Sequence, residues 1–393
     1  MLTPAQRDIV KATIPLLETG GEALTTHFYR ILLSEHPEVR AMFNQAHQAS
    51  GAQARALAHG VLMYAKHLDR LEGMGNLAAQ IVNKHVSLQV QPAHYPIVGG
   101  CLLRAIREVL GADVATDAVI EAWGVAYGQL ADILIGAERS VYDTNAQAPG
   151  GWRGARSFRV EAKVPESAEI TSFVLVPADG GAVKDFAPGQ YLGLKLSIDG
   201  EEVRRNYSLS AAPNGRSYRI SVKRELEGQV SGFLHDRVKV GDTIDLFPPA
   251  GEFTLPEGDR PLVLISGGVG ITPLLAMLES VLPSGRPVHF IHCARDAGVH
   301  AFRETIDRLA EAHPQLTRRY VYADHAEPAP VPDAVGLLSA EHLREWLPES
   351  RDVDACFVGP KAFMQSVRRH LVEVGVPAAQ TRWEFFGPAS ALA

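Results

Sequence analysis

His85 is the residue of this chain whose type and position could carry the most chemistry. It lies in a stretch with helical apolar spacing, on one face with Ile81 and Leu88, so its imidazole points towards an apolar interior. A neutral imidazole in that position is a candidate metal ligand. Taken alone, however, such a histidine is more often a satisfied core residue, and the local pattern favours that interpretation.

A glycine-rich turn in the last third of the chain could bind a dinucleotide. Gly267 and the run Gly268, Val269, Gly270, Ile271, Thr272 and Pro273 follow an apolar stretch and open a helical one. Glycines let the backbone approach a pyrophosphate, and a helix N-terminus supplies N–H groups and a positive dipole. The pattern is not the usual GxGxxG fingerprint. An ordinary strand-to-helix turn is the alternative.

A second motif could bind a phosphorylated flat heterocycle. Arg205, Asn206, Tyr207 and Ser208 end a β segment about fifteen residues after the Pro-Gly-Gln turn that precedes Tyr191. Arginine pairs with phosphate through two parallel hydrogen bonds, a tyrosine ring can stack on a heterocycle, and a serine can bind its edge. The alternative is a surface arginine beside a barrel tyrosine.

The elements that must position these residues change in type along the chain. Up to about residue 140, apolar residues recur at intervals of three and four, which predicts six or seven helices. Helices of mixed length fit a globin-type packing better than a four-helix bundle. We expect breaks at Gly20-Gly21, His36-Pro37, residues 73–75, Gln91-Pro92 and Gly111.

Beyond a linker at 145–151 the pattern becomes one of short strands and then of alternating strands and helices. The first set predicts a small antiparallel barrel, with strands at 158–162, 171–176, 191–196, 218–222 and 243–246. The second predicts a parallel α/β sheet, with strands at 261–265, 288–292 and 356–358 and helices at 273–282, 301–312 and 362–374.

The composition limits the functions to consider. With 393 residues, the chain should form two or three domains, and its net charge of −7 with interspersed signs gives no support for nucleic-acid binding. The three cysteines are distant from one another and form no CxxC motif, so we expect a reducing compartment and a cytoplasmic protein. We expect no signal peptide and no membrane span. We also expect a monomer.

The order of the motifs resembles the ferredoxin-NADP reductase superfamily. RxYS is followed by Gln229, Val230 and Ser231, then by GGVGITP, Val358-Gly359-Pro360 and a terminal aromatic segment. The resemblance implies that Tyr191 and the RxYS residues bind FAD, that residues 229–231 lie near its pyrophosphate, and that residues 268–273 receive NAD(P)H. It extends the FAD contacts to Glu384, Phe385, Phe386, Gly387 and Pro388.

Two positions depart from the superfamily pattern. Val358 stands where a cysteine is frequent near the nicotinamide, and Glu227-Gly228 stands where two glycines are frequent. The first departure concerns the fine control of hydride transfer and not its existence.

The chain as a whole resembles the bacterial flavohaemoglobins. That resemblance implies a multidomain protein with an all-α globin domain (1–140), an antiparallel β-barrel FAD domain (152–257) and an α/β parallel-sheet NAD(P)-binding domain (260–393). It makes His85 the proximal ligand of haem b, with Tyr95 and Glu138 as its catalytic partners. Taken alone, Tyr95 would be a helix-start tyrosine and Glu138 a solvated glutamate.

The resemblance also assigns the distal side of the haem. Tyr29 would stabilise bound O2, Gln53 and Leu57 would form the distal gate, and Phe43 would pack on the porphyrin. A core tyrosine with a backbone partner is the alternative for Tyr29. Lys84 and Glu384 match a pair between the haem and FAD edges, with surface charge as the alternative.

The function implied by the resemblance is that of a nitric oxide dioxygenase. NAD(P)H would reduce FAD, FAD would reduce haem, and nitric oxide would react with haem-bound O2 to give nitrate. The alternatives are an O2- or lipid-binding globin with a reductase, for which a lipid would occupy the distal pocket, or a reductase of ferric ion or alkylhydroperoxides. The choice between NADH and NADPH stays open, because Arg295 could meet a 2′-phosphate or be solvated.

Overall fold

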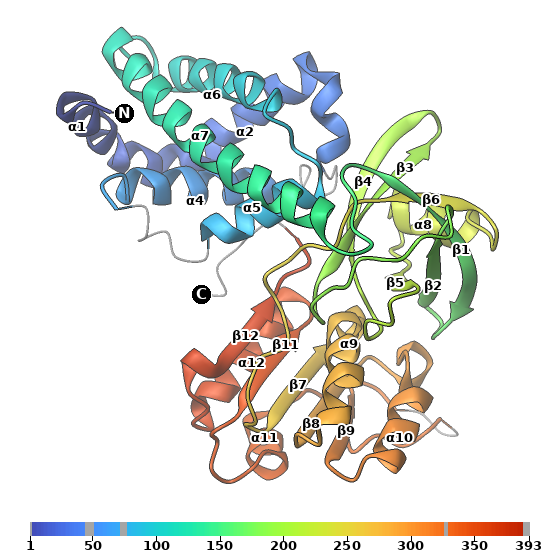
Figure 1. The fold of residues 1–393 in the computed structure, drawn as a ribbon. Helices are drawn as coiled ribbons and strands as arrows, with labels where there is room; N and C mark the ends of the chain where they lie inside the picture. Colours follow the sequence, from blue (N-terminus) through green and yellow to red (C-terminus); the bar gives the residue numbers. More distant parts are fainter. Residues whose placement is uncertain (1, 44–50, 71–76, 326–328, 388–393) are drawn as a thin grey trace. The chain divides into compact units, whose positions relative to one another are not determined.

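The computed structural model describes residues 2–43, 51–70, 77–325 and 329–387. The described chain divides into two compact units, one formed mainly by residues up to Gln147 and the other mainly by Ala148–Phe386 (Figure 1). The first unit is helical. The second contains two six-stranded sheets, as the change in sequence pattern predicts.

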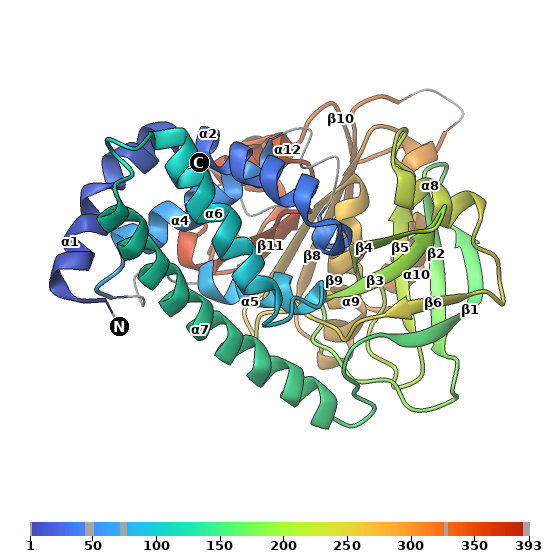
Figure 2. The same cartoon turned by 90° about the horizontal axis from the view of Figure 1, so that it is seen from above.

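The helical unit is built from six α-helices and one 3₁₀ helix within the described residues. Figure 2 shows the longest helix, α7, running beside α5 and α6. Thr3 begins the unit with a capping box, in which its hydroxyl accepts from the backbone N–H of Gln6 and the Gln6 side chain accepts in return. The elements are α1 (Pro4–Ala12), α2 (Ile14–Glu35), η1 (Pro37–Met42), α4 (Ala52–Lys66), α5 (Leu77–Ser87), α6 (His94–Leu110) and α7 (Asp117–Gln147).

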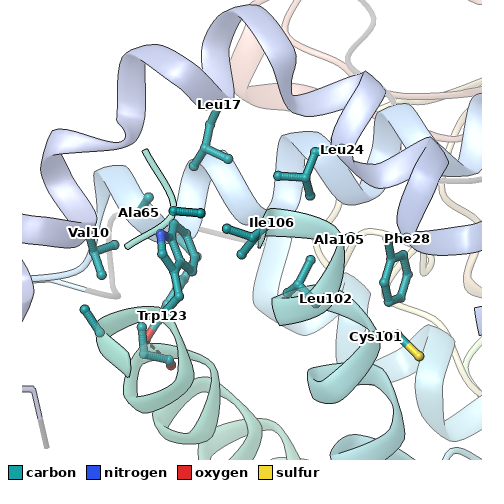
Figure 3. Packing of buried hydrophobic residues seen from close by; sticks show 14 of the residues in the cluster. Val10, Leu17, Leu24, Phe28, Ala65, Cys101, Leu102, Ala105, Ile106 and Trp123 are labelled. Carbon is teal, nitrogen blue, oxygen red and sulfur yellow. Dashed lines mark hydrogen bonds between the residues drawn. The ribbon is translucent and has the colours of Figure 1, made fainter. Parts of the chain in front are cut away.

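The core of this unit lies where α1, α2, α4, α6 and α7 meet. Figure 3 shows Trp123 of α7 in this core, among apolar side chains from the other helices. Its indole donates to the Thr13 hydroxyl at 3.3 Å, and the buried Tyr64 hydroxyl donates to the Ala126 carbonyl at 2.8 Å. The polar ends of both aromatic residues are therefore satisfied inside an apolar cluster.

The expected break at Gly20-Gly21 is wrong, because α2 continues through both residues to Glu35. Gly21 is buried, and a Cβ placed on it would lie 3.4 Å from the Cβ of Ala58 in α4. The small side chains at this crossing let the two helices pack closely. Tertiary packing therefore outweighs the low helix propensity of glycine here.

Helix α7 also extends further than expected, since it reaches Gln147 and includes the first residues of the predicted linker. Among the described helices it alone has the length and apolar composition of a membrane span, with a mean hydropathy of 1.3 over its best window. Core helices of globular domains share this composition, and α7 buries Trp123, Leu134 and Tyr142 in the helical unit.

The first sheet is the predicted antiparallel barrel. Its strand order is β4-β3-β6-β1-β2-β5, and an isolated bridge between Leu209 and Ile220 joins the two outer strands. A short helix, α8 (Gln229–Asp236), follows the last of the outer strands. The strands are β1 (Arg156–Pro165), β2 (Ile170–Pro177), β3 (Tyr191–Ile198), β4 (Glu201–Ser208), β5 (Tyr218–Lys223) and β6 (Thr243–Leu246).

The second sheet is parallel, with strand order β10-β9-β8-β7-β11-β12. Helices α9 (Ile271–Val281) and α10 (Arg303–Ala312) pack on one face, and α11 (Ala340–Trp346) and α12 (Lys361–Glu373) pack on the other (Figure 1). The chain order reverses between β7 and β11, which is where open α/β sheets bind ligands. The strands are β7 (Leu262–Gly267), β8 (Val288–Ala294), β9 (Leu316–Tyr322), β10 (Ala334–Val335), β11 (Asp354–Val358) and β12 (Thr381–Glu384).

Two buried histidines make the stability of this second sheet depend on pH. The ring centroids of His292 and His300 lie 4.3 Å apart, with the ring planes tilted by 33°. Their Nδ1 atoms lie 2.7 Å from the hydroxyls of Ser266 and Tyr322, respectively. Burial lowers the pKa of His292 to about 3, and it also lowers the pKa of His300. Both rings are therefore neutral in the fold, whereas the unfolded chain takes up protons below about pH 6.5.

We expect the free energy of unfolding of the second unit to fall as the pH decreases below about 6.5, because only the unfolded chain gains these protons. His292→Gln should reduce that loss by roughly 1 kcal/mol between pH 6 and pH 5, as measured by urea unfolding. His313→Gln, at a partly exposed position outside this pair, is the control. If the free energy of unfolding of His292→Gln falls between pH 6 and pH 5 by as much as that of the wild type, this assignment is contradicted.

Candidate functional site

His85 lies at the centre of a hydrogen-bonded cluster that joins α5, α6 and α7 and whose other two members, Tyr95 and Glu138, are buried. Its Nδ1 atom lies 2.7 Å from Oε1 of Glu138 and 3.1 Å from the hydroxyl of Tyr95. The Tyr95 hydroxyl donates to the same carboxylate oxygen at 2.5 Å. The structure thus brings together the three proximal residues named from the sequence.

The Glu138 carboxylate is only 2% exposed. A buried carboxylate without partners would be strongly destabilising, and here the imidazole N–H and the phenol O–H both point at one of its oxygens. Burial and the neighbouring carboxylate together raise the pKa of Tyr95, so its hydroxyl stays a donor. The charge is therefore tolerated through charge-assisted hydrogen bonds.

This arrangement fits a haem iron. The hydrogen bonds fix Nδ1 as the donor nitrogen of His85, which leaves Nε2 as the basic nitrogen for a metal. The His85 side chain remains 33% exposed although Val82 and Val86 of the same helix are buried. Apolar side chains on nearby elements are also only partly buried, as a flat apolar macrocycle would require; they include Phe43, Leu57 and Ile81.

A second cluster in the helical unit surrounds Tyr29. Its ring makes edge contacts with Phe28 and with Phe43, at centroid distances of 4.9 and 5.6 Å, and its hydroxyl bonds the Gln53 side chain. Burial raises the pKa of Tyr29, so the phenol is protonated. Leu57 follows Gln53 by one turn of α4. The four distal residues named from the sequence therefore come from α2, α4 and the end of η1.

The RxYS residues form the end of β4. Ser208 is buried, whereas Arg205, Asn206 and Tyr207 are partly exposed. The next backbone N–H, of Leu209, donates to the Gln190 carbonyl at 2.9 Å, so this strand end lies beside the Pro-Gly-Gln turn that leads into Tyr191.

Two glycines shape this part of the barrel. Gly189 has φ +108°, and a Cβ there would lie 2.2 Å from the Phe253 carbonyl oxygen. Gly251 lies against the ring of Tyr191, which is 4% exposed. A side chain at either position would displace the turn that carries Tyr191.

Helix α8 begins at Gln229, directly after Gly228. The Ser231 hydroxyl donates to the Gly228 carbonyl and accepts from the Glu225 N–H, each at 3.1 Å, which orders the turn at the helix start. At the other end, the ammonium of Lys163 donates to the carbonyls of Leu234, His235 and Val238 at 2.6–3.1 Å. Lys163 was not anticipated from the sequence, since β1 and α8 are far apart along the chain.

The glycine-rich turn lies where the chain order of the parallel sheet reverses. Gly268–Gly270 form a 3₁₀ turn after β7, and α9 begins at Ile271, with the Thr272 hydroxyl bonding the Val269 carbonyl at 2.9 Å. A Cβ at Gly270 would lie 2.2 Å from the Val358 carbonyl oxygen, and a Cβ at Gly359 would lie 2.5 Å from the Phe363 ring. Phe363, also unanticipated, packs beneath both loops.

The terminal segment is described only in part. Glu384 ends β12, Phe385 packs against the face covered by α11 and α12, and Phe386 is exposed. Gly387 is the last described residue, and Pro388 lies outside the described residues. Lys84 and Glu384 belong to different compact units, so their pairing stays a prediction.

Three family models match successive parts of the chain. They are a globin over residues 26–134, an oxidoreductase FAD-binding domain over 157–255 and an oxidoreductase NAD-binding domain over 264–369. Flavohemoproteins of Pseudomonas putida and Pseudomonas aeruginosa are 65% and 64% identical to the chain over 392 residues, covering all of each protein. The chain belongs to the flavohemoprotein family.

Solved structures agree with this membership. A flavohemoglobin of Malassezia yamatoensis with bound FAD and haem matches with a TM-score of 0.84 at 27% identity, covering 98% of this chain and all of that one. The FAD/NAD-binding domain of a Vibrio cholerae nitric oxide dioxygenase matches with a TM-score of 0.56 at 41% identity, covering 60% of this chain and all of that one. This flavohemoprotein is an oxidoreductase whose cofactors are haem, FAD and a nicotinamide nucleotide. The three-part fold predicted from the sequence is confirmed.

We expect Gly270→Ala to impair the use of NAD(P)H, because its methyl group would push the turn after β7 away from the end of β11. A displacement of about 1 Å at a reacting centre can lower a rate by about a hundredfold. The kcat/KM for NADH, measured with ferricyanide as acceptor, should fall about tenfold or more while the flavin absorbance is kept.

Gly20→Ala is the matched control, since a Cβ at this helical position meets no atom within 4 Å. It should leave the reductase rate unchanged and slightly stabilise α2. Normal kcat/KM in Gly270→Ala would show that the close contact does not position the nucleotide.

Proposed function

We propose that this flavohemoprotein is a nitric oxide dioxygenase. Each nitrate formed takes one nitric oxide, one O2 and one electron, so one NAD(P)H supports two turnovers. The 41% identity to the FAD/NAD-binding domain of the Vibrio cholerae nitric oxide dioxygenase supports this activity. The alternatives are an oxygen or lipid carrier and a reductase of other acceptors.

The observation that carries the proposal is the hydrogen bond between His85 and the buried carboxylate of Glu138. A carboxylate that accepts the Nδ1 proton makes an imidazole a stronger electron donor to a metal at Nε2. Stronger donation favours O–O bond activation over reversible oxygen storage. Glu138 accepts from both His85 and Tyr95 at distances of 2.7 and 2.5 Å, and these hydrogen bonds support the proposed donation.

Besides an electron-donating histidine, the proposed reaction requires a protonated hydrogen-bond donor on the distal side, and Tyr29 supplies it. Its hydroxyl is neutral, buried and already oriented by Gln53. A polar diatomic ligand with partial negative charge would accept a hydrogen bond from it. Leu57 and Phe43 border the same region with apolar surface, which limits the access of water to the reaction.

The second unit supplies the electrons. When bound, FAD accepts a hydride and releases single electrons, and haem iron accepts one electron and binds O2. We assign Arg205 to the flavin phosphate, Tyr207 and Ser208 to the flavin ring, and the start of α8 to the pyrophosphate. The turn from Gly268 to Pro273 would hold the nicotinamide nucleotide.

Other assignments stay predictions. They are Tyr191 and the terminal segment as FAD contacts, the Lys84–Glu384 pair, the exact domain boundaries, a lipid in the distal pocket, a monomeric state and a cytoplasmic location.

The holoprotein supplied with NADH, O2 and nitric oxide is expected to consume nitric oxide and release an equal amount of nitrate, with two nitrates per NADH. A nitric oxide electrode and a nitrate assay measure both quantities. Tyr29→Phe should raise the KM for O2 about tenfold, because one hydrogen bond from a neutral donor is lost.

Tyr64→Phe removes the hydroxyl of another buried tyrosine, one that donates to a backbone carbonyl, and serves as the control. Consumption of nitric oxide that does not depend on NADH, or that yields no nitrate, would refute the dioxygenase assignment. An unchanged KM for O2 in Tyr29→Phe would refute the distal role alone.

A further inference from the structure

Arg295 directly follows β8, the strand that pairs with β7 in parallel up to Gly267 and Cys293. In dinucleotide-binding α/β sheets of the Rossmann type, a side chain about twenty residues beyond the glycine-rich turn contacts the 2′ position of the adenosine ribose, and Arg295 occupies the comparable place in this sheet. An arginine there can bind the 2′-phosphate that distinguishes NADPH from NADH. This placement rests on the proposed assignment of the nucleotide to the Gly268 turn.

The guanidinium of Arg295 is already paired with the carboxylate of Glu169, at the tip of the hairpin between β1 and β2. The hairpin is held beside the loop after β8, because the Ala168 N–H donates to the Gly298 carbonyl at 2.9 Å. The Ser167 hydroxyl accepts from the N–H groups of Glu169 and Ile170 at 3.3 and 3.2 Å. The carboxylate is therefore presented by an ordered turn.

Two other charged side chains near this loop, Asp296 and Arg303, already have partners among the described residues. Asp296 adds a carboxylate, which accepts from the N–H groups of Gly298 and Val299 at 2.8 and 3.3 Å. The guanidinium of Arg303 donates to the Tyr322 hydroxyl at 2.6 Å and lies 3.7 Å from the Asp307 carboxylate. A 2′-phosphate approaching Arg295 would thus compete with the Glu169 carboxylate for a guanidinium that is already paired.

We propose that Glu169 is a specificity-determining residue that favours NADH over NADPH by holding Arg295 in an ion pair. The side chain of Arg295 is 64% exposed and that of Glu169 is 27% exposed. An exposed ion pair changes an equilibrium constant by at most about fivefold. The pair therefore sets a graded preference, and NADPH remains a weaker substrate.

The test compares kcat/KM for NADPH and NADH in the full holoprotein, with ferricyanide as acceptor so that neither O2 nor nitric oxide is required. Glu169→Gln should raise the NADPH-to-NADH ratio about threefold to fivefold, because Arg295 becomes available to the phosphate. It should also strengthen competitive inhibition by 2′-AMP relative to 5′-AMP. Arg295→Gln should lower the ratio, and the double variant should match Arg295→Gln.

Glu166→Gln is the control, because it removes a carboxylate from the same hairpin that forms no ion pair with the described residues. It should leave the NADPH-to-NADH ratio unchanged. The proposal would be overturned if Glu169→Gln left the NADPH-to-NADH ratio of kcat/KM unchanged. It would also be overturned if the increase in this ratio persisted in the double variant. Equal changes for both nucleotides, with loss of flavin absorbance, would show that Glu169 only supports the hairpin and would also overturn it. Because the assay omits nitric oxide, these outcomes do not depend on the dioxygenase assignment.

Discussion

The buried carboxylate of Glu138 is the constraint on which the helical unit depends. A charge that is 2% exposed is stable only with donors in place, and the two donors come from different helices, His85 from α5 and Tyr95 from α6. The same hydrogen bonds that compensate the charge orient the imidazole and fix its tautomer. Packing and chemistry are therefore coupled, because the helices cannot shift without leaving a buried charge unpaired.

The second unit depends on a different constraint, the close approach of backbone segments. Gly270 and Gly359 lie where a Cβ would overlap the chain or the Phe363 ring, at the point where the order of the parallel strands reverses. The rings of His292 and His300 are also buried in this unit, with their centroids 4.3 Å apart. Short contacts of this kind fix the position of a backbone more precisely than side-chain packing alone.

Local signals in the sequence predicted much of this architecture. The glycine-rich turn and RxYS could be located because their residues are adjacent in the chain. Glu138 and His85 were ambiguous by local pattern, since burial and hydrogen bonding depend on residues up to 53 positions away. The resemblance to a family was needed to connect them. Strand β9 was missed because Arg318 and Arg319 interrupt its apolar alternation, and Gly21 was misinterpreted because its packing partner lies in another helix. Lys163, Phe363 and Glu169 act through contacts between distant segments that no local pattern encodes.

If Glu138 makes His85 a strong electron donor to haem iron, as we propose, the bond between iron and histidine should respond to the carboxylate. Resonance Raman spectroscopy measures this response as the iron–histidine stretching frequency of the ferrous protein, compared between wild type and Glu138→Gln. The amide keeps the shape of the side chain but accepts the Nδ1 proton less strongly. We expect a lower frequency in the variant, with a haem midpoint potential raised on the order of 50 mV. An unchanged frequency and potential in a folded, haem-loaded variant would contradict this role of Glu138.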